Sequence, residues 1–356
     1  MPHLFEPLTI KGITLRNRIG VSPMCQYSST DGVANDWHLV HLGSRAVGGA
    51  GLVIAEATAV SAEGRITPGD AGIWSDQQME PLARINRFIK QHGAVSGIQI
   101  AHAGRKASAS RPWDGGDHLD EQQGGWTPVA PSPVAFGDGL DKIPHALSIE
   151  EIGQVKQDFV AATRRALASG YEWLELHSAH GYLSHEFLSP LTNQRTDQFG
   201  GSFENRIRFL LETVAATREV WPDHLPFTVR LSCTDWVEGG WDIEQSIELA
   251  RRLKTNGVDL IDCSSGGAVP DAKVPVAPGY QVAFAERIRK EAAIATAAVG
   301  LINEPEMADE IVRSGQADLV YLARELLRDP YWPARAAKAL DQKKALSPPN
   351  QYARAW

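Results

Sequence analysis

Eight short apolar runs, separated by longer amphipathic stretches, constrain the fold of this 356-residue chain more than any other feature. Several of these runs are nearly continuous rather than alternating, which is typical of parallel strands that are buried on both faces. The eight predicted strands are residues 19–24, 52–57, 95–100, 171–177, 227–232, 260–264, 295–300 and 319–323. We therefore expect an α/β protein built on a parallel sheet.

Helical patterns fill the gaps between these strands. The predicted helices are residues 149–168, 204–221, 243–254, 305–314 and 333–340. Ser148 and Glu151 form a capping-box pattern at the start of the first of these helices. Eight strand–helix repeats predict a closed TIM (β/α)₈ barrel that forms one domain over residues 1–356. An open dinucleotide-binding sheet would need G-x-G-x-x-G after an early strand, and this motif is missing there.

Two segments lie outside the repeat. Residues 4–19 predict a hairpin with Lys11-Gly12 at its turn, in a position to close the barrel floor. Residues 101–146 form a long loop after the third strand, rich in Gly, Pro, Trp and Asp. Loops of this length are usually functional, and barrels carry their chemistry at the carboxyl ends of the strands. We expect the long loop at that face.

Composition and charge exclude several classes of protein. The net charge is −8, and the three cysteines, Cys25, Cys233 and Cys263, are far apart. Neither a disulfide framework nor a structural zinc site is expected. The N-terminus lacks a basic segment followed by an apolar run, and no stretch of about 18 apolar residues is present. We expect a cytoplasmic enzyme without a nucleic-acid or membrane partner.

His177 and His180 directly follow the fourth predicted strand. They are candidates for a metal pair with His185 or Glu186, for two neutral donors to an oxyanion, or for structural histidines in a turn. Tyr182 adds a phenol, which is a protonated donor at neutral pH and suits general-acid work. The residues alone support a metal site and a pair of hydrogen-bond donors to an oxyanion about equally. A second H-x-x-H, His38 and His41, falls on a predicted helix, and we interpret it as structural.

Arg230 lies near the end of the fifth predicted strand. Its guanidinium would be expensive to bury without a partner. It either pairs with Glu175 or Asp262 or stabilises charge on a bound, electron-rich ring. Gly300 and Arg324 follow the seventh and eighth strands, where barrels commonly bind phosphate. Together with the Ser-Ser-Gly-Gly run at 264–267, they predict an anion site.

Longer motifs then point to a family. They are SPMCQY at 22–27, QIAHAGRK at 99–106, HSAHGY at 177–182, HEFLSP at 185–190, the segment 193–206 that ends in GGSFENR, and QYARAW at 351–356. On these motifs, which span the chain, the sequence resembles the old yellow enzyme family of FMN-dependent NAD(P)H ene-reductases. It is most similar to the bacterial, xenobiotic reductase-like branch with an active-site cysteine.

The resemblance implies that FMN lies across the barrel mouth, with NADPH or NADH as hydride donor. It implies three sets of cofactor contacts: Pro23, Met24, Cys25, Ala57 and Gln99 at the flavin ring, Arg230 at its N1/O2 edge, and Ser265, Gly266, Gly300, Leu301, Ala323 and Arg324 at the phosphate. His177 and His180 would hold the oxygen of an enone or nitro substrate in a ping-pong reaction. Tyr182 would donate the proton, with Tyr27 lining the pocket and Cys25 tuning the flavin. The competing hypotheses are a metal-dependent barrel hydrolase and a non-catalytic flavin-binding protein.

The resemblance also concerns assembly. It implies a homodimer or homotetramer in which a tail of about residues 341–356 brings Arg354 and Trp356 to the neighbouring active site. The chain departs from the family at two positions. Ala323 replaces a common glycine before Arg324, and Ala355 replaces the glycine of the usual Arg-Gly-Trp ending. A backbone N–H donates equally well from alanine if its φ is negative. Three scattered cysteines argue against the iron–sulfur cluster of longer relatives.

Overall fold

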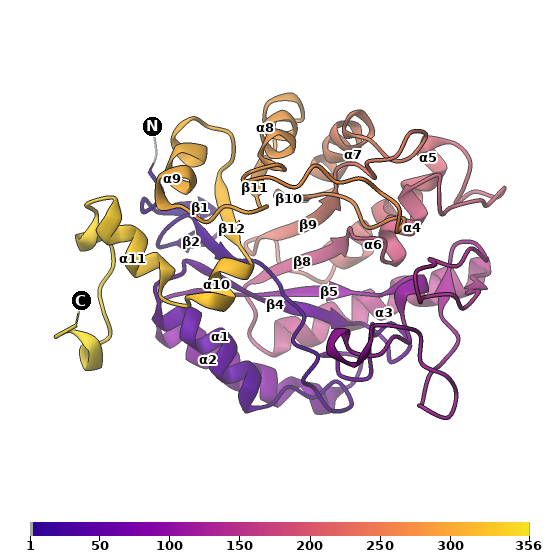
Figure 1. Cartoon of the computed structure of the whole chain (residues 1–356), viewed down its shortest axis with the longest axis horizontal. Coiled ribbons are helices and arrows are strands. Elements are labelled where there is room, and N and C mark those ends of the chain that lie inside the picture. The colour runs from indigo at the N-terminus through magenta and orange to yellow at the C-terminus, as the bar shows by residue number, and fades with distance from the viewer. Residues whose placement is uncertain (1–2, 356) are drawn as a thin grey trace.

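The computed structural model describes residues 3–355, and its centre is a closed barrel of eight parallel strands (Figure 1). Around the barrel the strands are β3 (Ile19–Val21), β4 (Leu52–Ala59), β5 (Val95–Ala101), β8 (Trp173–Ser178), β9 (Phe227–Ser232), β10 (Leu260–Ser264), β11 (Ala295–Ala298) and β12 (Leu319–Leu322). All eight predicted strands are confirmed, and β12 closes the ring by pairing with β3. The first strand is shorter than predicted because Pro23 has no N–H to donate to a ladder.

Helices cover the outside of the barrel (Figure 1). The longer ones are α1 (Asp36–Val47), α2 (Met79–Gln91), α3 (Ile149–Ala168), α6 (Arg208–Arg218), α7 (Ile243–Thr255), α8 (Val282–Glu291), α9 (Pro305–Arg313) and α11 (Trp332–Ala339). Shorter ones are α4 (Leu183–Leu188), α5 (Phe203–Arg206) and α10 (Arg324–Arg328). Ser148 and Glu151 form the predicted capping box at the start of α3. Within the described residues, no helix is both long and apolar enough to cross a membrane.

The predicted N-terminal hairpin closes the barrel floor. β1 (Leu8–Ile10) pairs antiparallel with β2 (Ile13–Leu15), and Lys11 adopts a positive φ of 53° at the turn. Leu15 packs in a fully apolar cluster with residues from the starts of the barrel strands, among them Trp173, Leu260 and Leu319. The floor is therefore closed mainly by apolar packing.

The predicted long loop extends from β5 and holds local structure. It contains single 3₁₀ turns at Gly104–Lys106 and Pro112–Asp114, and the short strands β6 (Val129–Ala130) and β7 (His145–Ala146) pair with each other. Further 3₁₀ turns lie at Asp76–Gln78, Lys343–Ala345 and Asn350–Tyr352. The loop lies at the end of the molecule away from the C-terminal tail (Figure 1).

Strand β4 carries one extra residue. Ala55 pairs with Ile98, but Ala57 pairs with Gln99, so that Glu56 forms a bulge. The Glu56 carboxylate accepts a hydrogen bond from the backbone N–H of Gln26 at 2.8 Å. Its other oxygen lies 3.4 Å from Nε2 of His38 on α1. The bulge thus fixes the loop after β3 beside the mouth of the barrel.

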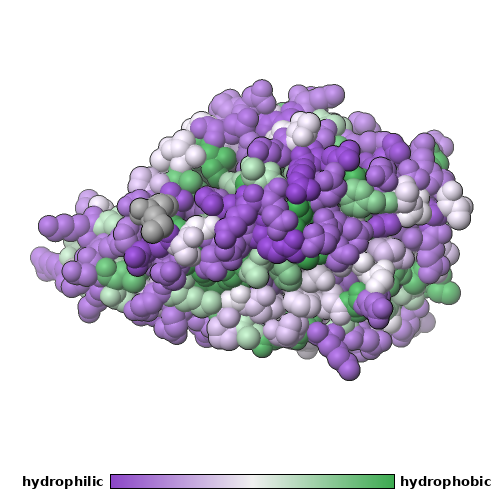
Figure 2. Space-filling model, turned by 90° about the horizontal axis from the view of Figure 1, so that it is seen from above, coloured by the Kyte–Doolittle hydropathy of each residue, from purple (hydrophilic) through white to green (hydrophobic). Residues whose placement is uncertain are grey.

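The view in Figure 2 shows a mostly hydrophilic surface with apolar residues in separate small areas.

Candidate active site

The turn at the end of β8 carries the two histidines and the tyrosine. His180 and Gly181 both have left-handed backbones, with φ of 60° and 73°. This conformation costs a non-glycine residue about 1–2 kcal/mol, so the surroundings must enforce it. The N–H of His180 donates to Ser232 Oγ at 2.9 Å, and the N–H of Gly181 donates to His185 Nδ1 at 2.9 Å. Nε2 of His185 lies 2.9 Å from Asp235 Oδ1, and both side chains are fully buried.

The two histidine rings lie nearly perpendicular to each other, with their centroids 5.1 Å apart. His180 Nδ1 lies 3.3 Å from His177 Nε2, and His180 Nε2 lies 2.7 Å from Ser264 Oγ. Burial, aided by the charge of Arg230, lowers the pKa of both rings well below its ordinary value. His177 Nδ1 accepts from the N–H of Ala179 at 3.2 Å, so a neutral His177 carries its proton on Nε2. The pair therefore consists of neutral rings, and the Nε2 proton of His177 is directed at Nδ1 of His180.

The candidate further metal ligands are already engaged. The contacts of His185 are those with Gly181 and Asp235, and Glu186 accepts the N–H of Arg105 at 2.8 Å. In the part of the chain that the structure describes, no group of three or more His, Cys, Asp or Glu side chains is placed to hold a metal ion. This geometry does not support the metal-hydrolase hypothesis. His38 is structural as predicted, because its Nδ1 accepts from the Asn35 N–H and its Nε2 lies 3.2 Å from Ser29 Oγ.

Tyr182 packs edge-on against His177, with their ring centroids 4.8 Å apart. Burial raises its pKa well above 10, and neighbouring Cys25 and Tyr27 contribute. Burial also raises the pKa of the Cys25 thiol and of the Tyr27 phenol, so all three groups stay protonated near neutral pH. Tyr182 and Ala57 line one small cavity together with the buried carboxyl of Asp70. The structure thus brings Cys25, Tyr27, Ala57 and Tyr182 into one region.

Arg230 is buried in an ion pair and also lines a cavity. Its Nε lies 3.1 Å from Asp262 Oδ2, and its Nη1 donates to Ser22 Oγ at 3.2 Å. Asp262, not Glu175, is therefore the direct ion-pair partner. Burial raises the pKa of Asp262 above its usual range, against the opposing charge of Arg230. The guanidinium also lines a cavity between the ends of the last strands, so it remains available to a bound group.

Glu175 forms a second buried carboxyl below the histidines. It accepts the amide Nε2 of Gln99 at 2.8 Å and the hydroxyl of Thr228 at 3.3 Å. Burial and the charge of Asp262 raise its pKa to about 8, while Arg230 opposes this shift. Gln99 therefore lies inside the barrel, one layer below the mouth.

The cavity beside Arg230 has a volume of about 150 Å³ and is lined by the ends of β10, β11 and β12. Its lining residues are Arg230, Ser264, Tyr280, Gln281, Val299, Gly300, Leu301, Ile302, Asn303, Tyr321, Ala323, Arg324 and Glu325. Among residues 3–355, no hydrogen-bond partner is found for the backbone N–H groups of Gly300, Leu301, Ala323 and Arg324. Two guanidinium groups and four free donors around one cavity suit an anion such as a phosphate.

Gly300 and Ala323 fit this cradle for different reasons. Gly300 has a φ of 122°, and a Cβ there would lie 2.9 Å from Gln281 Nε2. Ala323 has a negative φ of −106°, so its backbone is outside the left-handed region that favours glycine, although the family commonly has glycine here. These residues therefore fit the phosphate of FMN.

Some predicted cofactor residues lie elsewhere. Gly266 lies outside the cavity lining, and its N–H and C=O are already bonded to Thr234 and Ser232. Ser265 does not line the cavity itself. Its hydroxyl donates to Oε1 of Gln281 at 2.5 Å, and Gln281 lines the cavity. Pro23 and Met24 are half-buried in the loop after β3, next to Cys25.

The sequence prediction missed Tyr280, Gln281 and Asn303 in the cavity wall. Tyr280 and Gln281 stand directly before α8, which is the position where a barrel helix starts near the mouth. Their place at the start of a helix near the mouth was the signal that could have identified them. The irregular segment with Pro and Val residues before this helix made its start hard to recognise in the sequence.

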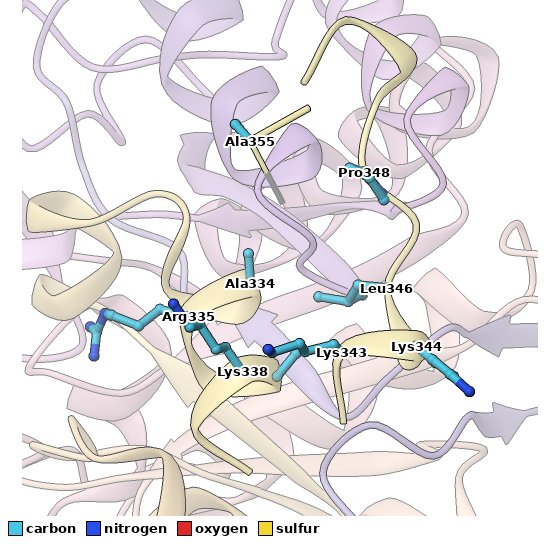
Figure 3. Close-up of a pocket in the computed structure, with 9 residues that line it drawn as sticks. Ala334, Arg335, Lys338, Lys343, Lys344, Leu346, Pro348 and Ala355 are labelled. Carbon is cyan, nitrogen blue, oxygen red and sulfur yellow. The ribbon is translucent and has the colours of Figure 1, made fainter. Parts of the chain in front are cut away.

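The C-terminal tail folds back on its own α11. Leu346 is buried, and in Figure 3 it points from the tail toward Ala334. The tail and helix enclose a pocket of about 580 Å³, rimmed by basic side chains that include Lys338 and Lys343 (Figure 3). Arg354 is exposed, whereas Trp356 lies outside the described residues.

Comparisons with known proteins agree with this geometry. Residues 3–343 match the model of the NADH:flavin oxidoreductase / NADH oxidase family. An NADPH dehydrogenase of Geobacillus sp. (strain WCH70) is 49% identical over 355 residues, which cover 99% of this chain and 98% of that protein. The NADPH dehydrogenase of Bacillus subtilis (strain 168) is 48% identical, with 99% of both chains covered. The structure of morphinone reductase is 28% identical with a TM-score of 0.79, covering 95% of this chain and 90% of that one.

Proposed function

The chain belongs to the NADH:flavin oxidoreductase / NADH oxidase family, which is the old yellow enzyme family, and from this premise we propose that it is an ene-reductase. It reduces the C=C bond of α,β-unsaturated carbonyl and nitro compounds, with NADPH or NADH as the hydride donor. The observation that carries this proposal is the arrangement of two neutral histidines beside a protonated tyrosine at the barrel mouth.

FMN is the cofactor that the site fits. Arg324 and the free N–H groups of Gly300 and Leu301 would hold its phosphate, and Arg230 would face the negative charge of the reduced ring. Pro23, Met24, Ala57 and Gln99 would contact the ring, with Cys25 at its edge. Bound FMN would supply hydride-transfer chemistry to the site.

The protein's own side chains prepare the substrate for this hydride. His177 and His180 donate hydrogen bonds to the carbonyl or nitro oxygen and draw electron density away from the β-carbon. One such preorganised donor typically contributes about 2.7–4 kcal/mol of transition-state stabilisation. Tyr182 gives its proton to the α-carbon, and its raised pKa keeps that proton in place until it is needed. Tyr27 lines the same pocket and excludes water from it.

An anaerobic titration tests this function. The purified protein, or protein reconstituted with FMN, is expected to be yellow, to bleach with one equivalent of NADPH, and to regain its colour with cyclohexenone. Cyclohexene, which lacks the activating oxygen, serves as the matched control and should not restore the colour. A preparation that cannot bind FMN, or reduced protein that is insensitive to enones, would contradict the proposal.

The proposal extends to assembly and cell compartment. We propose a homodimer or homotetramer in which residues 341–356 bring Arg354 and Trp356 to the neighbouring active site. The exposed position of Arg354 supports this arrangement. Unchanged enone KM and oligomeric mass in Arg354→Ala would contradict a contribution of that residue. Cys25, Cys233 and Cys263 are free thiols, which supports a cytoplasmic location.

A further inference from the structure

Lys106 lies at the start of the long loop, in the 3₁₀ turn that directly follows β5. Its Nζ donates to the carbonyl of His180 at 2.8 Å and to the carbonyl of Gly267 at 2.7 Å. One amino group therefore connects three loops, those after β5, β8 and β10. Two of these loops carry residues of the site described above, namely the histidine turn and the segment after Ser264.

The two bridged carbonyls belong to backbones in direct contact. A Cβ on Gly267 would lie 2.6 Å from the Cα of His180, and a Cβ on Gly181 would clash with the carbonyl of Gly267. Because the backbones pack this closely, their carbonyl oxygens come together without an intervening side chain. Lys106, from a third loop, satisfies both oxygens at once.

The bridge also completes the hydrogen bonding of the turn. The N–H groups of His180 and Gly181 are held by Ser232 and His185, and Lys106 holds the His180 carbonyl. This peptide lies between the two left-handed residues, whose conformation sets the directions of the His180 and Tyr182 side chains. Release of the carbonyl would let the peptide rotate and the histidine move.

The protonation state of Lys106 does not decide the bridge. Burial, with the charge of Arg105, lowers its pKa to about 7 against the opposing charge of Glu186. An ammonium has three N–H donors and a neutral amine has two, so either form can satisfy two carbonyls. The Phe136 ring lies 4.1 Å from Nζ and the Tyr182 ring 5.9 Å from it, and these rings cover the group.

We infer that Lys106 is a positioning residue for this reaction: by bridging the His180 and Gly267 carbonyls it fixes the turn from which His180 and Tyr182 act. This inference rests on the proposed function, since it assigns Lys106 a task in the same site. Lys106 acts through the turn and is not itself a donor to the substrate.

The test compares Lys106→Met with Lys142→Met. Methionine keeps the length and apolar stem of lysine but donates no hydrogen bond. Lys142 is a matched control, because it lies in the same long loop and its Nζ donates to the Trp126 carbonyl at 3.0 Å and to Ser108 Oγ at 3.3 Å. Both variants are purified with FMN, and their flavin content is measured by absorbance.

Binding of a phenol, which imitates the substrate oxygen between the histidines, is the first readout. We expect Lys106→Met to retain FMN, to bind p-chlorophenol about tenfold more weakly, and to lose up to about a hundredfold in enone reduction. Lys142→Met should match the wild type. Backbone hydrogen exchange of residues 177–185 is the second readout, and it should become faster in Lys106→Met alone.

Wild-type phenol affinity and unchanged exchange in Lys106→Met would overturn the inference, even if the wild type reduces enones. Failure of the wild type to reduce enones would instead contradict the proposed function, and hydrogen exchange would still report on the bridge. If Lys106→Met does not fold, Lys106→Gln provides the same measurements, because its shorter amide reaches fewer acceptors. Wild-type phenol affinity in that variant would likewise overturn the inference.

Discussion

At the barrel floor, β8 and β10 present Trp173 and Leu260 to a dry apolar cluster. Two residues further along, on the same inward side, these strands present Glu175 and Asp262, and after two more they present His177 and Ser264. Successive inward residues of one strand therefore change from fully apolar to ionisable within about 13 Å. The floor stabilises the barrel, whereas the upper layers hold polar groups whose burial is costly unless a ligand or a partner compensates.

This comparison predicts that mutations in the two regions separate activity from stability. Tyr182→Phe should have the largest effect on activity, because it removes the proton but keeps the ring against His177. We expect enone reduction to slow by about 10²–10⁴-fold, with flavin reduction by NADPH nearly unchanged. Stopped-flow measurement of the two half-reactions checks this. Equal slowing of both would contradict the role of Tyr182 as the acid.

Trp173→Ala should have the opposite profile. Its side chain is fully buried in the floor cluster, so we expect a loss of about 3–5 kcal/mol in the free energy of unfolding. The molecules that remain folded should reduce enones at the wild-type rate. Denaturant titration measures the loss, and Trp37→Ala, at a position that is 57% exposed, is the control with little expected change. A strong loss of the enone reduction rate in the folded fraction would contradict the distinction between the barrel floor and the upper layers.

His177→Ala tests the upper layer through binding. Loss of one donor should cost about 2.7–4 kcal/mol of transition-state stabilisation and should weaken the binding of phenols. Phenol titration, followed by the change in flavin absorbance, measures the effect. A phenol affinity equal to that of the wild type would count against the histidine pair.

The last prediction is a pH dependence of stability that originates in the middle layer. The folded protein keeps the proton of Glu175 up to about pH 8, whereas the unfolded chain releases it near its ordinary pKa of about 4.3. Between these values the native state binds more protons, so this group makes stability fall as the pH rises. Denaturant titrations at several pH values should show a shallower fall in Glu175→Gln. An unchanged slope would show that Asp262 or other groups determine it.

The same contrast explains how far the sequence could be used to predict the molecule. The barrel, the hairpin and α3 follow from periodicity and a local capping box, because each depends on short-range pattern. The predicted helix 204–221 is instead divided into α5 and α6, and it ends at Arg218. Arg218 donates to the carbonyl of Trp221 at 3.0 Å, so its side chain binds the residues that follow the end of the helix.

The site was predictable to a similar extent. His177, His180, Tyr182, Arg230, Gly300 and Arg324 stand at strand ends, where barrel chemistry is expected. Gln281 and Asn303 enter the cavity from loops whose course depends on contacts between distant segments. Lys106 could be found as part of a motif, but its two acceptors are backbone oxygens that become neighbours only in the folded chain.

The bulge at Glu56 has a consequence for how this strand can change in evolution and in laboratory recombination. Deleting this one residue would remove the bulge but leave the facing of Ala57 unchanged, because Ala55 and Ala57 already pair with two successive residues of β5, Ile98 and Gln99. The Glu56 carboxylate would also be lost from the backbone of Gln26 and from His38. Segments exchanged between related barrels should therefore cross over before residue 19 or after residue 59, so that the bulge and the two elements it anchors are inherited together.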